Sequence, residues 1–385
     1  MRILFDARGV RDQSDGLSNY VRHILSALLR IDGENEYVVL VGPTLMDEFS
    51  QGRWQARPNL RLVMTRCPFM GLAQQVQIPW LVGRLAPATL YHYPHFDMPL
   101  LAHPCSVVTI HDLNHVNFSA YFDSHKRLKQ SYSFCTTALS VRRARHIFAV
   151  SQTTKTQLLV KFPWLDPQKI SVTYEGPGAG FTTPPYPDRV AEFRRKFDLG
   201  EARYILYVGT DRTHKNLGRL LEAYQRLRQG GQVSQRLLLV GSLRQDGDVA
   251  RMITQLGLAP FVRQLGHVAD EELPLVYRVA DAFAFCSLSE GFGIPLLEAM
   301  ASEVPIVTSN FGAMAEVAGD GAQLVDPFSA ASIAEGLHRV LTSETLRAEL
   351  IAKGRKRSQR FCWEETARQT LAVYRKAGAD GMHAP

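Results

Sequence analysis

Short apolar runs alternate with longer amphipathic segments along the whole chain, and this alternation predicts most of its architecture. Apolar runs bounded by turn-forming residues are typical of buried strands, and apolar residues three or four positions apart are typical of helices that cover a sheet. The first half shows strand patterns at 2–7, 37–41, 60–65, 89–92, 107–111, 146–150 and 170–174, and helix patterns at 18–30, 126–143 and 153–161. The second half shows strand patterns at 203–208, 236–240, 282–286, 306–309 and 323–325, and helix patterns at 216–229, 248–255, 295–301 and 330–342.

Both halves thus predict an α/β fold in which helices cover both faces of a parallel sheet. Segment 176–187 is rich in glycine and proline and has no periodicity, which is typical of a connector. We therefore expect two domains, 1–180 and 188–363, with a final helix over 364–378 that packs back on the first. The length of 385 residues also fits two hydrophobic cores better than one.

Composition excludes several classes of protein. The longest apolar runs are shorter than the roughly 18–20 residues that cross a bilayer, and the first residues lack the apolar region of a signal peptide. Five scattered cysteines show no metal-binding spacing, so we expect buried free thiols. These features predict a soluble cytoplasmic protein.

The net charge of +7 is concentrated in the first half, where residues 1–180 hold 19 Lys and Arg against 13 Asp and Glu. Segment 126–145 alone has six cations and no acid, with apolar Leu128, Phe134 and Leu139 between them. An anionic membrane surface, a phosphate-bearing acceptor or a solvated helix face would each explain this stretch. Binding of nucleic acid is disfavoured, because we find no interleaved aromatic residues.

The strongest chemical signal is S-E-G-F-G-I-P-L-L-E-A-M at 289–300, directly after a predicted strand. Glycines 291 and 293 allow backbone amides to approach a ligand, and Pro295 suits the first turn of a helix, whose amino end attracts diphosphate. Glu290 in the loop and Glu298 in the helix would then present two carboxylates to sugar hydroxyls.

This glutamate-x7-glutamate segment resembles the signature of glycosyltransferase family 4, whose GT-B fold consists of two facing Rossmann-like domains with an interdomain cleft. The resemblance implies that Glu290 contacts the donor sugar and Glu298 the ribose hydroxyls. It also implies donor contacts in the intervening turn, made by Gly291, Phe292, Gly293 and Ile294.

The segment after the strand at 203–208 fits the same family. Gly209 begins a turn that suits phosphate, and Lys215 supplies a positive charge to the diphosphate. The family usually has arginine before this lysine, whereas this sequence has His214. Arg212, two residues earlier than that position, is therefore our candidate for the missing charge.

Other candidate residues follow predicted strands. His111 and Asp112 match the family's His-Asp pair, which implies that His111 lines the leaving-group side. Gly16, in the turn 14–20, would face the phosphates. His267 and Val268 would hold the base through backbone groups. We place His95, Trp80 and Asp112 on the acceptor side.

The resemblance further implies a retaining transfer without a metal or other cofactor, and Asp246-Gly-Asp248 reads as a turn rather than a metal site. The first half resembles bacterial mannosyltransferases of O-antigen or capsule assembly, which implies GDP-mannose as donor and a glycan or polyprenyl-linked acceptor. UDP-glucose or another hexose donor is the alternative, as is a non-catalytic nucleotide-sugar-binding protein. Contact of 126–145 with an anionic membrane completes the expected partners.

Overall fold

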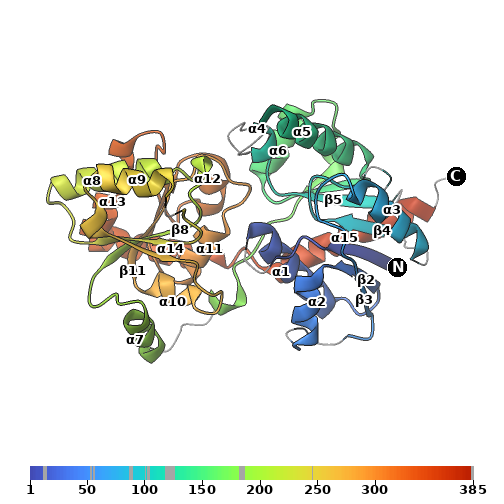
Figure 1. Ribbon diagram of the computed structural model, residues 1–385, viewed down its shortest axis with the longest axis horizontal. Coiled ribbons are helices and arrows are strands. Elements are labelled where there is room, and N and C mark those ends of the chain that lie inside the picture. The colour runs from blue at the N-terminus through green and yellow to red at the C-terminus, as the bar shows by residue number, and fades with distance from the viewer. Residues whose placement is uncertain are drawn as a thin grey trace. The chain divides into compact units, whose positions relative to one another are not determined.

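A computed structural model of the chain describes residues 1–11, 15–52, 54, 57–85, 90–99, 101, 105–117, 126–181, 187–244 and 246–382. The chain forms two compact units, the first made of Met1–Glu175 and Cys362–Pro385 and the second of Gly176–Phe361. The polypeptide therefore leaves the first unit once and returns to it at the end, as the colours of Figure 1 show. The sequence had predicted the first boundary at 180 and the return over 364–378.

The first unit is built on a seven-stranded parallel sheet in the order β3-β2-β1-β4-β5-β6-β7. Its strands are β1 (Arg2–Ala7), β2 (Glu36–Val41), β3 (Leu60–Met64), β4 (Leu90–Tyr93), β5 (Ser106–Ile110), β6 (His146–Ala149) and β7 (Ile170–Val172). Strand β1 pairs with β2 on one side and β4 on the other, so the direction of the winding reverses between β1 and β4. Ligands of such sheets bind at the carboxyl ends of the strands near this reversal.

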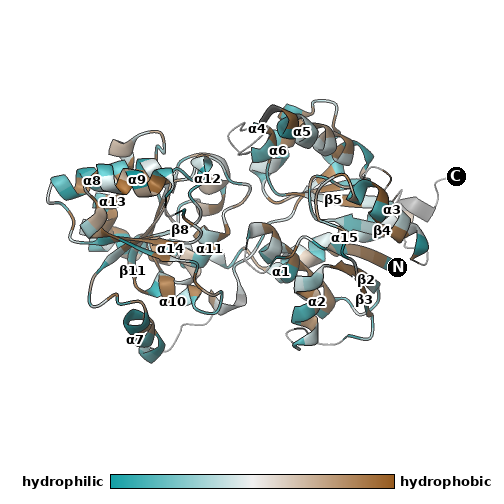
Figure 2. Ribbon diagram, viewed as in Figure 1, coloured by the Kyte–Doolittle hydropathy of each residue, from teal (hydrophilic) through white to brown (hydrophobic). Residues whose placement is uncertain are grey.

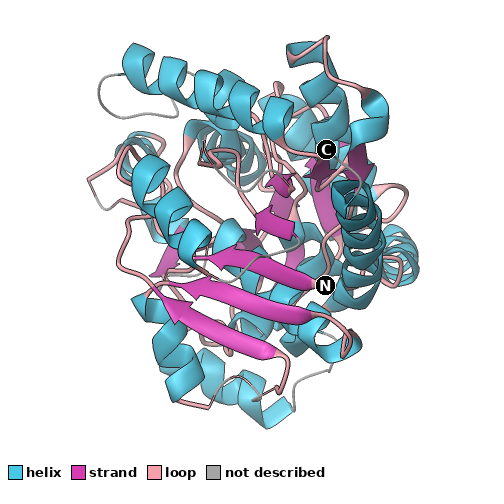
Figure 3. Cartoon of the chain, turned by 90° about the vertical axis from the view of Figure 1, so that its right-hand side faces the viewer, coloured by secondary structure: helices cyan, strands magenta, loops and turns pink. Residues whose placement is uncertain are grey.

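Helices cover both faces of this sheet, and Figure 3 shows the strands lying between them. The helices are α1 (Gly16–Ile31), α2 (Pro43–Ser50), α3 (Gln74–Arg84), α4 (Asn114–Asn117), α5 (Lys126–Arg143), α6 (Gln152–Lys161) and α15 (Trp363–Met382), with a 3-10 turn η2 (Pro167–Lys169). Alternate strand residues serve the two faces: Leu4 joins the core beneath α3, whereas its neighbour Phe5 packs against His92 on the other face. Both faces are buried, which explains the continuous apolar runs in the sequence.

Helix α15 completes the first unit from the far end of the chain. Its fully buried Tyr374 contacts His92 of β4 through the hydroxyl and packs edge-on against Phe148 of β6. At the start of the helix, Trp363 stacks on His23 of α1. The last twenty residues of regular structure are thus part of the first unit's core.

The second unit repeats the architecture with a six-stranded parallel sheet in the order β10-β9-β8-β11-β12-β13. Its strands are β8 (Tyr204–Val208), β9 (Arg236–Val240), β10 (Val262–Gly266), β11 (Ala280–Phe285), β12 (Ile306–Ser309) and β13 (Gln323–Val325). Its helices are α7 (Pro187–Lys196), α8 (Leu217–Gln229), α9 (Asp248–Gln255), α10 (Leu273–Arg278), α11 (Ile294–Ala301), α12 (Gly312–Ala318), α13 (Ala330–Thr342) and α14 (Glu344–Ser358). Its 3-10 turns are η3 (Ala179–Phe181), η4 (Thr213–Lys215) and η5 (Ala259–Phe261). In Figure 2 the strands carry mostly hydrophobic colours and the helices a mixture, as expected when helices shield a buried sheet.

The predicted α/β fold with two doubly wound sheets is confirmed, and all the predicted strands and helices are present with ends that agree to within two residues. The pattern missed β10, because this strand lies at the edge of the sheet and exposes Arg263 and Gln264, which removes the apolar run. Residue 89 of the predicted fourth strand, residue 14 of the predicted turn and residues 182–186 of the predicted connector lie outside the described residues.

Two local predictions need correction. The helix predicted from residue 18 begins at Gly16, because the carboxylate of Asp15 caps it by accepting a hydrogen bond from the Ser18 amide. The cysteines are all free, but Cys135 and Cys362 are exposed, and only the other three are buried. In the described part of the chain, we find no helix that is both long and apolar enough to span a bilayer.

Replacing Tyr374 with alanine should destabilise the first unit by about 3–5 kcal/mol, because it leaves a cavity between α15 and the sheet. Urea unfolding and hydrogen exchange should show the loss in α1 and β4, with the second unit unaffected. Arg375→Ala is the control, since the Arg375 side chain is 63% exposed on the same helix. Equal unfolding midpoints for the Tyr374 and Arg375 variants would contradict a structural role for α15.

Candidate functional site

The second unit gathers its candidate residues where the winding of the sheet reverses. Strands β8 and β11 are neighbours although they are distant in the sequence, and β9 and β12 continue the sheet on opposite sides. The loops that leave the carboxyl ends of β8 and β11 therefore lie side by side. One carries Lys215, and the other carries Glu290.

Two backbone contacts hold these loops together. The amide of Leu288 donates to the carbonyl oxygen of His214 over 2.7 Å. Asn216 adopts a left-handed conformation, with φ of 59°, and its side-chain amide donates to the carbonyl oxygens of Cys286 and Pro327. Asparagine tolerates this conformation better than most residues, so the T-H-K-N turn is built to meet the loop after β11.

Lys215 and Glu290 form an ion pair at this junction. The ammonium nitrogen of Lys215 donates to Oε2 of Glu290 over 2.9 Å and lies 2.8 Å from Oε1, and both side chains are largely shielded from solvent. Both oxygens of the Glu290 carboxylate are thus within hydrogen-bonding distance of the same ammonium. The buried hydroxyls of Thr210 and Ser287 make no hydrogen bond to the described part of the chain. A ligand rich in hydroxyl groups would satisfy such atoms.

Glycines line the same edge for steric reasons. A Cβ atom on Gly241, which follows β9, would lie 2.1 Å from the carbonyl oxygen of Gly209, which follows β8. A Cβ on Gly293 would lie 2.4 Å from Cε of Met314, and its φ of 105° favours glycine. Gly293 also caps α11, and Pro295 lies in the first turn of that helix, as predicted.

Glu298 lies one turn into α11 and is 6% exposed. Its Oε2 accepts a hydrogen bond of 2.7 Å from the hydroxyl of Tyr277 on α10. Burial raises the pKa of the Glu298 carboxyl to about 7, although the Tyr277 bond opposes this shift. The residue can therefore change its charge near neutral pH, which its sequence position did not reveal.

The remaining candidates of the second unit differ in exposure. Arg212 precedes η4 and is exposed, and His267 is exposed after β10. Val268 is buried, and the Phe292 side chain packs against Phe361 in the core, which leaves only its backbone for a ligand. Ile294 is the first residue of α11.

In the first unit, His111 follows β5 and joins residues from three other segments. Its Nε2 donates to the carbonyl oxygen of Pro94 over 3.1 Å, and its ring packs edge-on against Tyr20 of α1. Its Nδ1 lies 3.4 Å from Oε1 of Glu175, whose side chain is 5% exposed. Glu175 is therefore placed to orient the imidazole ring of His111. We missed Glu175 in the sequence, since it lies three residues after β7 without a recognisable motif.

Asp112 has a local structural role. Its Oδ1 accepts a hydrogen bond of 2.8 Å from the amide of Asn114 at the start of α4, and lies 3.7 Å from Nδ1 of His115. Burial opposes ionisation, but the hydrogen bond and charge of His115 lower the pKa of Asp112 to about 2. The carboxylate is therefore charged at neutral pH and orients the segment that follows His111.

The acceptor-side candidates do not all lie together. His95 follows β4, and its Nδ1 is 2.7 Å from Oδ1 of the buried Asp97. Trp80 lies apart from it on the outer side of α3, is 58% exposed, and stacks against Arg84 at 3.7 Å. Gly16 is the first residue of α1 and is exposed.

A buried polar network that the sequence did not predict supports this edge of the first unit. Asp6 of β1 is fully buried and accepts hydrogen bonds from Arg8 and from the hydroxyl of Tyr91. Gln74 at the start of α3 donates to Asp97 over 2.8 Å. These contacts join β1, β4 and α3 and hold Asp97 against His95. A buried ion pair is costly unless its groups are fully hydrogen-bonded, as they are here. The network therefore holds Asp97, and through it His95, in a fixed place.

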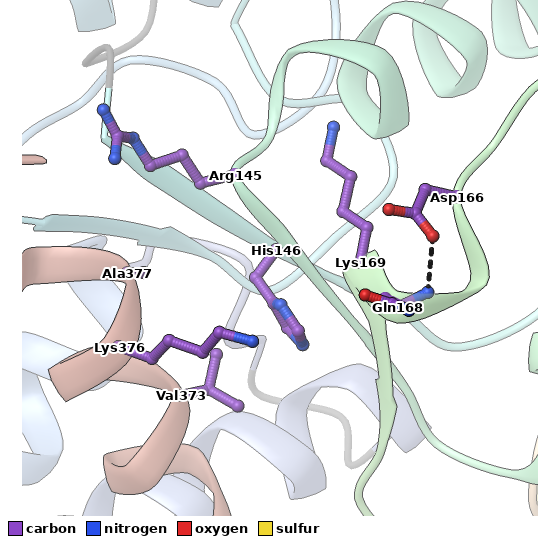
Figure 4. Close-up of a pocket in the computed structure, with 8 residues that line it drawn as sticks. All are labelled: Arg145, His146, Asp166, Gln168, Lys169, Val373, Lys376 and Ala377. Atoms are coloured by element: carbon purple, nitrogen blue, oxygen red, sulfur yellow. Dashed lines mark hydrogen bonds between the residues drawn. The ribbon is translucent and has the colours of Figure 1, made fainter. Parts of the chain in front are cut away.

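A cavity of ≈ 320 Å³ lies at the opposite edge of the first unit, at the amino ends of β6 and β7 (Figure 4). Its lining includes Arg145, His146, Lys169 and Lys376 but none of the predicted site residues. Lys169 donates to the carbonyl oxygens of Val141 and Arg142 and so satisfies the end of α5. Lys169 thus has a structural role, and the cavity is separate from the carboxyl ends of the strands that carry the predicted site residues.

Within the described residues, we find no group of three or more His, Cys, Asp or Glu side chains placed to hold a metal ion. Asp248 is in the first turn of α9 and contacts Arg251, and Gly247 rather than an aspartate caps that helix. The predicted D-x-D triplet is therefore a helix start.

Comparison with known proteins agrees with this architecture. HepE from Anabaena, crystallised in complex with UDP and glucose, has a TM-score of 0.75 and 19% identity, covering 98% of this chain and 100% of that one. WaaG, a glycosyltransferase involved in lipopolysaccharide biosynthesis, has a TM-score of 0.71 and 17% identity over 97% of this chain and 99% of its own. The two doubly wound α/β units, together with the similarity to these two solved structures, identify the fold as GT-B.

Sequence comparison identifies a domain in the second unit and relatives along the chain. Residues 189–357 match the family described as glycosyl transferases group 1. O-antigen chain mannosyltransferase B of Escherichia coli is 27% identical over 386 residues, covering 97% of this chain and all of that protein. MMP alpha-(1->4)-mannosyltransferase of Mycolicibacterium hassiacum is 38% identical over 46% of this chain and 43% of its own length. Residues 189–357 thus carry a glycosyl transferases group 1 domain, and the chain is a glycosyltransferase.

The raised pKa of Glu298 predicts pH-dependent donor binding. Only the carboxylate can accept hydrogen bonds from two ribose hydroxyls, so the donor should bind the deprotonated form. Calorimetry should show constant affinity well above pH 7 and a loss of up to tenfold per pH unit below it, with proton release on binding at pH 6.

Two variants test the assignment. Glu298→Gln should bind the donor more weakly by about 1.5–3 kcal/mol and without this pH dependence. Tyr277→Phe removes a bond that lowers the pKa of Glu298, so the fall in affinity should move to higher pH. An unchanged pH profile in the Glu298→Gln protein would rule out Glu298 as its source.

Proposed function

We propose that the protein transfers a hexose, mannose from GDP-mannose in the first instance, to a glycan or polyprenyl-linked oligosaccharide of a surface polysaccharide. The observation that carries this proposal is the Lys215–Glu290 pair at the β8–β11 junction. It combines a charge for a diphosphate with a carboxylate for a sugar. Similarity to O-antigen chain mannosyltransferase B along almost the whole chain supports the choice of sugar and acceptor.

We assign the donor to the second unit. Lys215 and Arg212 neutralise the diphosphate, and the amides of Gly291, Gly293 and the start of α11 meet its oxygens. Glu298 holds the ribose, and backbone groups near His267 hold the base. The Glu290 carboxylate, held beside the Lys215 ammonium, accepts from a sugar hydroxyl.

We assign the acceptor to the first unit, where His111 lines the leaving-group side and His95 lies at the neighbouring strand end. Glu175 fixes the ring of His111 from one side and the carbonyl of Pro94 from the other. With both nitrogens of its ring engaged in this way, His111 is a positioning group and a hydrogen-bond partner rather than a nucleophile.

The proposed transfer retains the anomeric configuration without a metal or other cofactor. Charge develops on the departing diphosphate, and Lys215 stabilises it most because the ammonium is already oriented and partly shielded. We assign deprotonation of the acceptor to the leaving phosphate, on the same face of the sugar. Nuclear magnetic resonance of the new glycosidic linkage distinguishes this stereochemistry from inversion.

A panel of nucleotide sugars tests the donor. The purified protein should release GDP from GDP-mannose in the presence of a lipid-linked or oligosaccharide acceptor. UDP-glucose is the competing donor, favoured by the solved neighbour that binds UDP and glucose. Release of UDP instead of GDP would replace the donor assignment, and tight binding without any release would favour the non-catalytic alternative.

We expect protein side chains, rather than a metal ion, to neutralise the negative charge of the diphosphate. Lys215→Gln should lower kcat by about 10²–10³, the range seen when one preorganised group that stabilises developing charge is lost. Lys353→Gln, on the surface of α14, is the matched control. EDTA should leave the activity of both wild type and control intact. Activity that EDTA abolishes and magnesium or manganese restores would contradict the metal-free mechanism.

A further inference from the structure

Three helices of the first unit form one layer on the same face of its sheet. Ile78 and Val82 of α3, Val141 of α5 and Leu158 of α6 share one buried cluster with alternate residues of the strands. The other face is covered by α1 and α15, which reach the intervening strand residues through Tyr20 and Tyr374. The exposed apolar residues and the charges of the two helix layers can therefore be compared.

The outer side of the α3–α5–α6 layer exposes large apolar side chains. The most exposed are Leu72 (77%) and Val76 (72%) on or just before α3, Leu128 (74%) on α5, and Val160 (75%) on α6. Trp80, Phe134, Leu139 and Trp164 add to them. In the described part of α1, α2 and α15, Ile31 is the only such residue, at 36%. One face of the unit is thus unusually apolar toward solvent.

Charge divides in the same way. The sequences of α3, α5 and α6 contain eight Lys and Arg and no Asp or Glu. Those of α1, α2 and α15 contain five Lys and Arg and five Asp and Glu. The apolar layer is therefore also the basic layer.

Helix α3 is the clearest element of this surface, because it has two apolar sides. Ile78 and Val82 face the core, whereas Leu72, Val76 and Trp80, spaced four residues apart, face outward. The guanidinium of Arg84 lies 3.7 Å from the ring centre of Trp80. Tryptophan with a neighbouring cation is typical of residues at a membrane–water interface.

Similar pairs occur on the rest of the layer. Arg142 of α5 lies over the ring of Trp164, at 5.9 Å, and Lys161 of α6 lies over that of Phe134, at 5.8 Å. The three apolar residues noted within 126–145, Leu128, Phe134 and Leu139, are all exposed.

We propose that the outer face of the α3–α5–α6 layer docks on an anionic lipid bilayer, with its apolar side chains entering the interface. Exposed aliphatic residues favour a bilayer over nucleic acid, and the absence of acids favours anionic lipid over a second, equally basic copy of the chain. The proposal extends the electrostatic contact expected for 126–145 by adding an apolar component, which salt does not screen. It does not depend on which sugar is transferred.

The test is co-sedimentation with vesicles of phosphatidylglycerol and phosphatidylcholine at low and high salt. Wild type should bind at low salt and retain part of its binding at high salt. Lys129→Gln/Arg142→Gln/Arg143→Gln should lose about a hundredfold in affinity at low salt, since each cation near an anionic surface contributes about a factor of five. Leu72→Ser/Val76→Ser should lose the part that persists at high salt.

The control variants replace exposed apolar residues that lie outside this helix layer. Ile31→Ser on the opposite layer and Phe328→Ser, 61% exposed in the second unit, should bind vesicles like wild type. Brominated lipid should quench the tryptophan fluorescence of wild type, and Trp80→Phe should lose part of that quenching. Release of nucleotide diphosphate with a water-soluble acceptor should be unchanged in Leu72→Ser/Val76→Ser, which separates docking from catalysis.

Three results would overturn the proposal. Wild type could remain in the supernatant with phosphatidylglycerol vesicles at low salt. The α3 variant and the controls could bind equally well. The α3 variant could instead abolish a dimer seen by sedimentation velocity without vesicles, which would assign the surface to a second copy of the chain.

Discussion

The pairing of β8 with β11 is the constraint on which the candidate donor site depends. These strands are separated by two further strands in the sequence, yet their carboxyl ends are adjacent because the sheet winds outward from them in both directions. The turn after β8 and the loop after β11 are then fixed to each other by the Leu288–His214 and Asn216–Cys286 contacts. Only this arrangement places an ammonium and a carboxylate within hydrogen-bonding distance across 75 residues of sequence.

The two carboxylates of the signature segment lie in different electrostatic environments. Glu290 has a cation beside it, whereas Glu298 has a neutral tyrosine hydroxyl and a buried surrounding. Burial without a counter-charge favours the protonated form, which explains why the pKa of Glu298 is raised to about 7. The same motif thus holds one carboxylate beside a cation and one whose charge depends on its surroundings, including any bound ligand.

The sequence predicted the strands well, because buried parallel strands are continuous apolar runs bounded by turns. It predicted the positions of Lys215, Glu290 and His111 for the same reason, since each lies at the end of such a run or in the loop that follows it. The sequence could not predict contacts between distant segments. Glu175 lies near His111 only because β5 and β7 belong to one sheet, and Gln74 contacts Asp97 only because α3 packs against that sheet. The outward-facing stripe of α3 was also hidden, because a helix with apolar residues on both sides has no clear periodicity.

The return of the chain to its first unit has an evolutionary consequence. Residues 176–361 form one uninterrupted stretch of sequence, whereas the unit around them is assembled from two separate pieces. A single recombination cassette can therefore replace the whole second unit, to which we assign the nucleotide sugar, while the unit that carries α15 can be exchanged only as two coordinated pieces. New donor specificities should consequently be acquired more easily by such a gene than new acceptor specificities.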